Sequence, residues 1–180
     1  MDKKELTVAS RLIYHGKIID VYEDDVLCPN KETAQREIVK HRGGVGVLLE
    51  IDGQFILEKQ FRYAINEVII EIPAGKLEVG EDPLESAKRQ LLEETGYHPF
   101  TMFHLGDIYP TAGYSSEVIH LYYSSRAILK QRQLDRDEVI DLITLSLKDI
   151  EQLILENKIK DAKTIAAINL YKLHKEAGKI

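Results

Sequence analysis

The sequence predicts an α/β sandwich, and three observations carry this prediction. Alternating or continuous apolar segments, rich in Val, Ile, Leu and Tyr, occupy most of residues 8–72. A segment with helical apolar spacing interrupts them at 83–95. Further strand-like segments follow, and two helical segments close the chain. This order differs from a regular βαβ repeat, so the strands and helices are expected to form separate layers.

The N-terminal half is expected to consist of strands joined by short turns. His15-Gly16 separates the first two strands, and Asp52-Gly53 is a hairpin signal between two apolar ones. The last strand of this half ends at Pro73, because proline has no N–H to donate to a neighbouring strand. The expected strands are 8–14, 18–26, 36–41, 45–51, 54–60 and 67–72.

A helix is expected after this series of strands. Pro83 suits the first helical turn, Asp82 is a candidate N-cap and Gly96 is a helix stop. The apolar residues at helical spacing are Leu84, Ala87, Leu91 and Leu92. Strands then return at 102–108, 118–124 and 139–145, followed by a helix at 146–157, with Ser146 as its cap, and another at 161–176.

Size, charge and cysteine content limit the classes of function. A chain of 180 residues suits one globular domain with a small extension. Its net charge of -6 argues against a general nucleic-acid binder, which needs a basic face. No apolar run is long enough for a membrane span, and no signal-peptide-like segment follows the N-terminus. With Cys28 as its one cysteine, the chain has no intrachain disulfide framework, and a cytoplasmic location is expected.

The strongest functional signal lies in residues 75–97, which read GKLEVGEDPLESAKRQLLEETGY. On a helix, positions 90, 93 and 94 are related by i+3 and i+4, so their side chains project from neighbouring sites. Glu81, just before the helix, can reach back toward Arg89. Clustered carboxylates suit hard divalent cations, and Mg²⁺ would offset the charge of a bound diphosphate. The segment therefore predicts a metal-dependent phosphate site.

This segment resembles the Nudix box, G-x5-E-x7-R-E-U-x-E-E-x-G-U, in which U is an apolar residue. The matching residues are Gly75, Glu81, Arg89, Leu91, Glu93, Glu94, Gly96 and Tyr97. One position departs from the pattern, because Gln90 stands where the family has its first Glu after Arg. The resemblance implies a Nudix fold for residues 42–180, an α/β/α sandwich with a mixed sheet. Residues 1–41 are then an antiparallel β extension that serves dimerisation.

Segments outside the box resemble the ADP-ribose pyrophosphatase subgroup. They are REIVKH at 36–41, QFR at 60–62, EIPAG at 71–75, YPTAGYSSE at 109–117 and DAKT at 161–164. The subgroup usually has Pro-Gly where this chain has Ala112-Gly113. The resemblance implies Mg²⁺-dependent hydrolysis of ADP-ribose to AMP and ribose 5-phosphate by a homodimer that exchanges N-terminal strands. Mn²⁺ is an alternative metal, and another nucleoside diphosphate sugar, such as GDP-mannose, an alternative substrate.

The same resemblance implies roles at the catalytic centre. Ala74 would bind metal through its carbonyl, together with Glu94 and position 90, and Glu93 would bind or support the metal. Arg89 belongs to the same catalytic group. The acidic loop 135–138 would supply the general base, for which Glu138 is the first choice and Asp137 the second.

Substrate contacts are implied elsewhere in the chain. Arg62 would contact the diphosphate or the adenine, and Glu117 would lie near the terminal ribose. Arg36 and Glu37 would shape the adenine site across the dimer interface. The six histidines show no metal-ligand spacing in the sequence, so we expect them to be structural or surface residues.

Gln90 leaves the level of activity open. Glutamine is nearly isosteric with glutamate, but it is neutral and has an NH₂ donor in place of one acceptor oxygen. We therefore expect normal folding, weaker metal binding and slower turnover. Three origins compete: a natural site compensated by nearby acids such as Glu93, an engineered Glu→Gln change, or a natural Nudix protein that binds a nucleotide without cleaving it.

Overall fold

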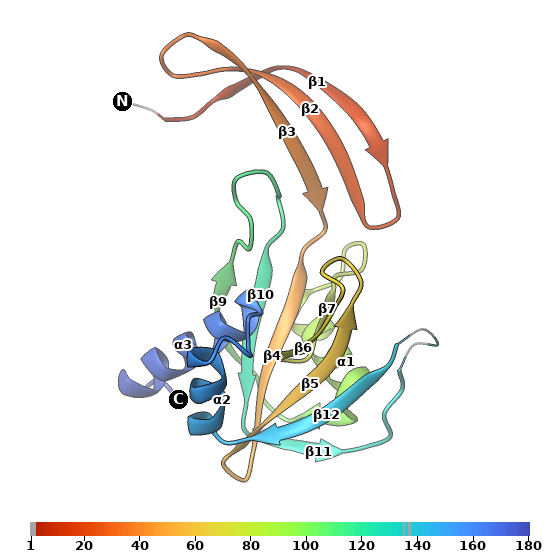
Figure 1. Ribbon diagram of the computed structural model, residues 1–180, viewed down its shortest axis with the longest axis vertical. Coiled ribbons are helices and arrows are strands. Elements are labelled where there is room, and N and C mark those ends of the chain that lie inside the picture. The colour runs from red at the N-terminus through yellow and green to blue at the C-terminus, as the bar shows by residue number, and fades with distance from the viewer. Residues whose placement is uncertain (1–2, 135, 137) are drawn as a thin grey trace. The chain divides into compact units, whose positions relative to one another are not determined.

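The computed structural model describes residues 3–134, 136 and 138–180 (Figure 1). The chain divides into two compact units. One comprises residues 1–43 with 109–118, and the other comprises 44–108 with 119–180. No helix among the described residues has the length and apolar character needed to cross a bilayer.

The first unit is an antiparallel sheet of three strands, β1 (Leu6–His15), β2 (Ile19–Leu27) and β3 (Thr33–His41), in that order. Residues 109–118 attach to β3, where the Val39 N–H donates to the Tyr114 carbonyl at 2.8 Å and the Ser116 N–H donates to the Val39 carbonyl at 2.9 Å. Among the described residues of this unit, Val26 is the one buried apolar side chain. The unit therefore has almost no core of its own.

The second unit is built around a seven-stranded mixed sheet with the strand order β12-β5-β4-β10-β9. In addition, β6 pairs with β5 and β7 pairs with β4. The strands are β4 (Gly44–Ile51), β5 (Gln54–Arg62), β6 (Glu67–Glu71), β7 (Ala74–Lys76), β9 (Phe103–Ile108), β10 (Ile119–Ser124) and β12 (Ile140–Leu145). The β10–β4 pair is parallel and the other pairs are antiparallel. The mixed sheet that the sequence predicted is confirmed.

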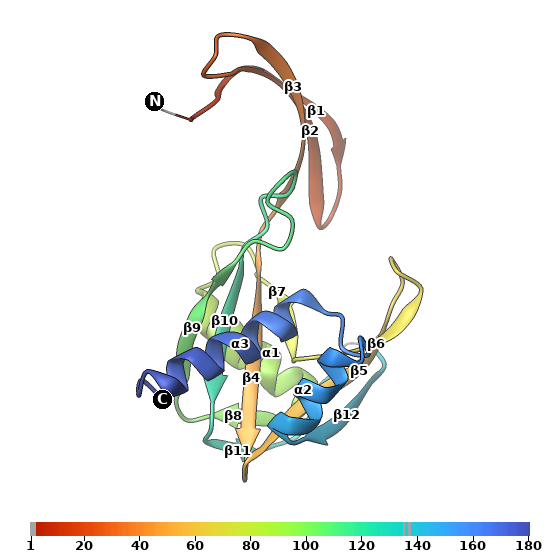
Figure 2. The same ribbon diagram turned by 60° about the vertical axis from the view of Figure 1, so that its left-hand side comes forward.

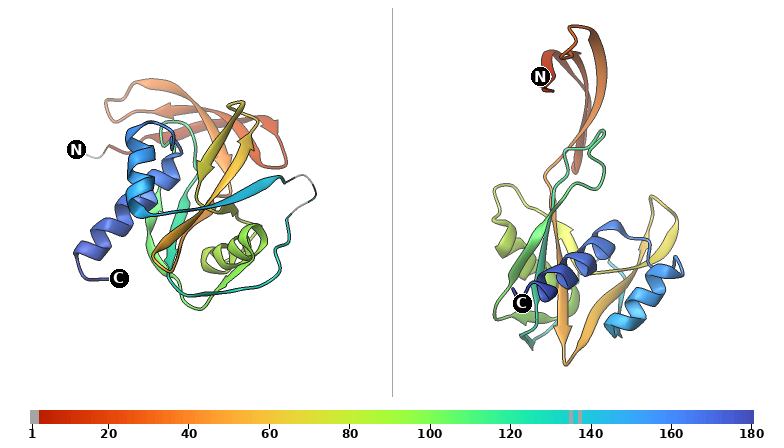
Figure 3. Two further views of the ribbon diagram at one scale, coloured as in Figure 1. Left: turned by 60° about the horizontal axis from the view of Figure 1, so that its bottom comes forward. Right: turned by 90° about the vertical axis from the view of Figure 1, so that its left-hand side faces the viewer.

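Helices cover both faces of this sheet (Figures 2 and 3). Helix α1 (Pro83–Thr95) packs Ala87 and Leu91 against alternate residues of β4 and against Ile56 of β5. On the opposite face, α2 (Leu147–Leu155) and α3 (Ala162–Glu176) pack against Leu48 and Leu57. Because successive strand residues point to opposite faces, the two apolar clusters share the same strands. The expected α/β/α sandwich is confirmed.

The ends of α1 follow from its sequence. The Asp82 carboxylate accepts hydrogen bonds from the N–H groups of Leu84 and Glu85, and Pro83 occupies the first helical turn. Gly96 ends the helix in the left-handed conformation, at φ 80°, and its N–H donates to the Leu92 carbonyl. These caps fix where the following side chains of the helix project.

Three short strands were not predicted: β7, β8 (Tyr97–Pro99) and β11 (Ala127–Leu129). Three residues are too few to show an alternating pattern, so their pairing with β4 and with each other decides their conformation. Gly75, the first residue of the box, lies within β7. Helix α2 also ends at Leu155, two residues before the expected end.

Candidate active site

The Nudix-like segment brings β7 and α1 together. Ala87, Leu91 and Glu94 follow one another at i, i+4 and i+7, and all three are buried. Glu94 thus continues the apolar stripe of α1, and 3% of its surface is exposed. Its Oε2 accepts a hydrogen bond from the Ala74 N–H at 2.8 Å. The structure thereby joins two of the residues that the sequence assigned to the metal.

Gln90 lies one turn before Glu94 and rests on Gly75. A Cβ built on Gly75 would lie 2.0 Å from both Cδ and Oε1 of Gln90, so no other residue fits there without displacing the Gln90 side chain. This close approach explains the glycine. It also places the amide of Gln90 directly against the β7 backbone, beside Ala74.

Arg89 and Glu93 lie on the neighbouring stripe of α1. The Arg89 guanidinium donates to both oxygens of Glu81 at 2.8 Å and to Oε2 of Glu93 at 3.0 Å. The expected contact between Glu81 and Arg89 is confirmed. These hydrogen bonds from Arg89 lower the pKa of Glu81 to about 2. Arg89 therefore binds carboxylates of its own segment, which makes it a positioning residue in this structure.

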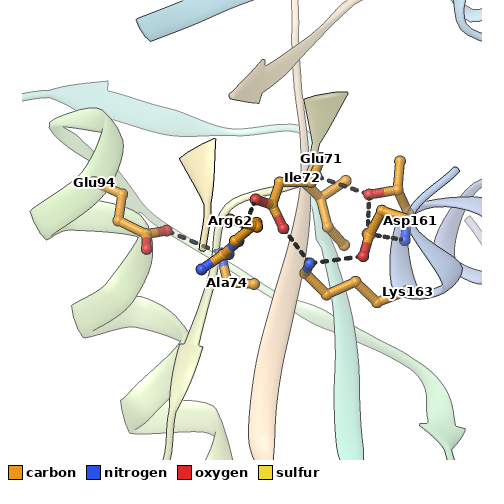
Figure 4. A network of polar contacts seen from close by, with 8 residues as sticks. Arg62, Glu71, Ile72, Ala74, Glu94, Asp161 and Lys163 are labelled. Atoms are coloured by element: carbon orange, nitrogen blue, oxygen red, sulfur yellow. Dashed lines mark hydrogen bonds and ion pairs between the residues drawn. The ribbon is translucent and has the colours of Figure 1, made fainter. Parts of the chain in front are cut away.

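A polar network around the buried Glu71, which joins β5, β6 and the start of α3, was not predicted (Figure 4). Glu71, with 1% of its surface exposed, accepts from Nε of Arg62 at 2.8 Å and from the Lys163 ammonium. Lys163 also donates to Asp161 at 3.0 Å. Arg62 thus reaches the site from β5 with its orientation fixed by Glu71. Asp161 and Lys163 belong to the segment 161–164, whose resemblance was noted without a role.

Glu58 is a second buried acid for which the sequence predicted no role. It lies in the middle of β5, 1% of its surface is exposed, and its Oε1 has no hydrogen-bond partner. Burial raises the pKa of Glu58 well above its usual range, and the charge of Glu71 adds to the rise. Burial likewise raises the pKa of Glu94, and the nearby Glu58 and Glu138 carboxylates contribute. Glu58, Glu94 and Glu138 are therefore electrostatic neighbours.

The loop before β12 is tied to the end of α1. Arg132 donates through Nε to the Glu94 carbonyl and through Nη2 to the Ile140 carbonyl at 2.9 Å. This arginine holds the ends of the segment that carries Glu138. The alternative base, Asp137, lies outside the described residues.

The other expected substrate contacts lie in the first unit. Arg36 binds Glu5 through two hydrogen bonds of 3.0 and 2.6 Å, and Glu37 is exposed. Glu117 pairs with Nδ1 of His41 at 3.4 Å. A cavity of about 470 Å³ within this unit is lined by Glu23, Gln35, Arg36, Glu37, Gly113 and Tyr114. Arg36 and Glu37 therefore share one concave surface.

One expectation about the histidines was incomplete. Asp107 accepts hydrogen bonds from His104 at 2.7 Å and His120 at 2.8 Å, and the ligand atoms of the three residues lie within 4.8 Å of one another. The sequence hides this cluster because a bulge at Gly106 turns Asp107 to the side of His104, and His120 comes from the neighbouring strand. Its donors are partly exposed and already paired with each other.

A family model for the NUDIX domain matches residues 40–168 of this chain. The chain belongs to the Nudix family. This confirms the family that the box predicted, although the box itself lacks one glutamate at Gln90.

Two curated relatives resemble this Nudix protein over nearly its whole length. An ADP-ribose pyrophosphatase from Bacillus subtilis (strain 168) is 41% identical over 97% of this chain and 95% of the relative. A methanol dehydrogenase activator from Bacillus methanolicus is 39% identical over 94% of each chain. Among solved structures, an ADP compounds hydrolase has a TM-score of 0.85 at 17% identity, covering 98% of this chain and 97% of its own. That likeness supports the Nudix fold.

The donor atoms near β7 suit the divalent metal ions that Nudix ADP-ribose pyrophosphatases generally use. Glu94, Gln90 and Ala74 offer a carboxylate, an amide oxygen and a backbone carbonyl, which are the oxygen ligands of hard cations. The unpartnered Oε1 of Glu58 is a further oxygen donor that protein groups leave unsatisfied. The residues present therefore fit a hard divalent cation.

Proposed function

We propose that this Nudix protein hydrolyses ADP-ribose to AMP and ribose 5-phosphate with Mg²⁺ as cofactor. The observation that carries the proposal is the whole-length similarity to an ADP-ribose pyrophosphatase. The close arrangement of Ala74, Gln90 and Glu94 supports it. Mn²⁺ is a second candidate metal, because the same oxygen donors accept either ion.

In this proposal the metal is held by the Ala74 carbonyl, Gln90 and Glu94. Glu93 supports the site through its bond to Arg89, which in turn is held by Glu81. A bound Mg²⁺ would neutralise the diphosphate and lower the pKa of a coordinated water. Gln90 contributes an amide oxygen where a carboxylate would contribute a charge, so turnover is expected to be slower than with Glu.

Glu138 is proposed as the general base. Its carboxylate contributes to the raised pKa of Glu94, which supports a position close to the proposed metal. It would accept a proton from the attacking water, and Arg132 would fix the segment that presents it.

Arg62 is proposed to bind the diphosphate. A guanidinium pairs well with phosphate oxygens, and Glu71 holds the Nε side of Arg62 at 2.8 Å. In the first unit, Arg36, Glu37 and Glu117 are proposed as contacts to the rest of the nucleotide. We further propose that the protein works as a homodimer that exchanges N-terminal strands.

Gln90 favours a second candidate function, a nucleotide-binding protein with weak catalysis. Neutral Gln90 reduces the negative charge available to metal and thus the expected rate. Another nucleoside diphosphate sugar stays an alternative substrate for the same chemistry.

The testing experiment measures AMP release from ADP-ribose with Mg²⁺ for the native chain and for Gln90→Glu. The proposal expects measurable release from the native chain and faster release from the variant. Glu85→Gln is the control, because Glu85 lies on the outer side of α1, paired with Lys88 at 2.6 Å. Release from neither protein, while both bind ADP-ribose, would favour the binding function.

A further inference from the structure

Glu58 is a buried acid with one unsatisfied oxygen. Its Oε1 accepts no hydrogen bond from the described residues, and Arg132, Arg62 and Lys163 act on it through their charges alone. Glu71, its cross-strand neighbour in the β5–β6 register, is equally buried but is bound by Arg62 and Lys163. A buried carboxylate that is left unsatisfied destabilises a fold unless a ligand or ion supplies the missing partner.

The strand pattern places Glu58 on the face of the sheet that α1 covers. Ile56 packs with Ala87 and Leu91 of α1. Glu58 lies two residues after Ile56 on the same strand, so it points to the same face. Along α1, Glu94 follows Leu91 on the buried stripe. Glu58 and Glu94 therefore approach each other from β5 and α1.

Gln90 of α1 has no carboxylate, but Glu58 provides one from β5, on the other side of the space next to Glu94. Glu94 and Gln90 approach the β7 backbone from α1. Mg²⁺ in proteins is held by one or two carboxylates, with waters and substrate phosphates completing its shell. Glu58 is a second buried carboxylate close to Glu94, and its Oε1 has no hydrogen-bond partner among the described residues.

We propose that Glu58 is a ligand of the divalent metal ion and supplies the charge that Gln90 does not. This inference rests on the proposed function for the location of the metal. It explains how the chain keeps a two-carboxylate site while one box position is neutral. It also gives a physical reason for a buried carboxylate in the middle of β5.

The experiment measures Mn²⁺ binding by electron paramagnetic resonance and calorimetry, without substrate. The proteins are the native chain, Glu58→Gln and the control Glu85→Gln, each freed of metal first. Loss of a group that holds a metal shell together typically weakens binding about 10- to 100-fold, and we expect at least that loss for Glu58→Gln. The control should bind as the native chain does.

The thermal midpoint of the metal-free proteins separates a ligand from a structural residue. Glutamine has nearly the same shape as glutamate and is neutral without binding a proton, so metal-free Glu58→Gln should melt no lower than the native chain. Added Mn²⁺ should then stabilise the native chain more than the variant. A lower midpoint without metal, or unchanged Mn²⁺ affinity, would overturn the inference. If Glu58→Gln does not fold, Glu58→Asp tests the same point, because its shortened carboxylate should weaken Mn²⁺ binding.

A double variant tests the exchange of roles directly. Glu58→Gln combined with Gln90→Glu should recover most of the Mn²⁺ affinity that Glu58→Gln loses. No recovery of Mn²⁺ affinity in the double variant would contradict the inference.

Different results would exclude the proposed function and this inference. If Mn²⁺ binding depends on Glu58 but no sugar nucleotide is hydrolysed, the proposed function is wrong and this inference stands. If ADP-ribose is hydrolysed but Mn²⁺ binding does not depend on Glu58, this inference is wrong and the proposed function stands.

Discussion

The carboxylates near α1 differ in pKa and in their contacts because their surroundings differ. Glu81 is held by two hydrogen bonds from one guanidinium and stays charged. Glu94 of α1 and Glu58 of β5 are buried between the helix and the sheet, and burial raises the pKa of both. Glu93, four residues after Arg89, pairs at the partly exposed edge of the same helix. The box residues thus divide into a group that orders the helix and a group that faces β7.

Glu81→Gln is expected to lower the free energy of unfolding at neutral pH, because the bidentate pair with Arg89 is lost. The pKa of Glu81 falls to about 2 in the folded state. A lowered pKa gives stability that is present above the unfolded value, about 4.3, and is lost as the pH falls toward 2. The difference between native and variant in urea unfolding should therefore shrink between pH 5 and pH 2. A difference independent of pH would contradict this account.

At the scale of elements, β7 and α1 are joined through one small contact. Gly75 leaves room for Gln90, and Ala74 donates to Glu94. The proposed metal site therefore depends on how closely a three-residue strand approaches one helix.

Gly75→Ala tests that approach. The added methyl would overlap Gln90, and over-packing of this kind costs about 1–3 kcal/mol of unfolding free energy. Gln90→Ala in the same chain removes the overlapping atoms, so the double variant should regain much of the loss. A double-mutant cycle in urea measures the coupling. Additive effects would show that the two side chains do not compete for space. Gly113→Ala is the control for adding a methyl group, because a Cβ at Gly113 would meet no atom within 4 Å. Gly53 is unsuitable as a control, because its φ of +74° would strain an alanine.

Helices and strands with strong local signals could be predicted from the sequence. Features that depend on contacts between distant residues could not. Asp82 and Gly96 marked α1 because caps act within a few residues. Glu58 gave no such signal, because β5 is buried on both faces and its apolar run shows no alternation. The partners of Arg62 were also hidden, because Lys163 meets Glu71 across 92 positions of sequence. The box predicted the helix and the side chains that face β7, whereas long-range contacts made on folding bring Glu58 of β5 close to them.

The two units of the chain differ in how they can be stable. The second unit buries apolar residues on both faces of its sheet. The first is a three-stranded sheet whose edge strand β1 is exposed along its whole length. A long exposed edge with apolar side chains is a site for pairing with another chain. This favours the proposed homodimer, with β1 as part of its interface.

Charge on β1 should therefore break the dimer. Leu6, Val8, Leu12, Ile13 and Tyr14 are each at least half exposed in the single chain. Burying a lysine ammonium in place of Val8 or Ile13 costs far more than leaving it in water, so Val8→Lys and Ile13→Lys should shift the protein toward monomer. Sedimentation equilibrium over a range of concentrations measures the dissociation constant. Glu32→Lys, in the turn between β2 and β3, is the control for added positive charge. A native chain that sediments as a monomer, or lysine variants that dimerise as the native chain does, would exclude β1 from the assembly.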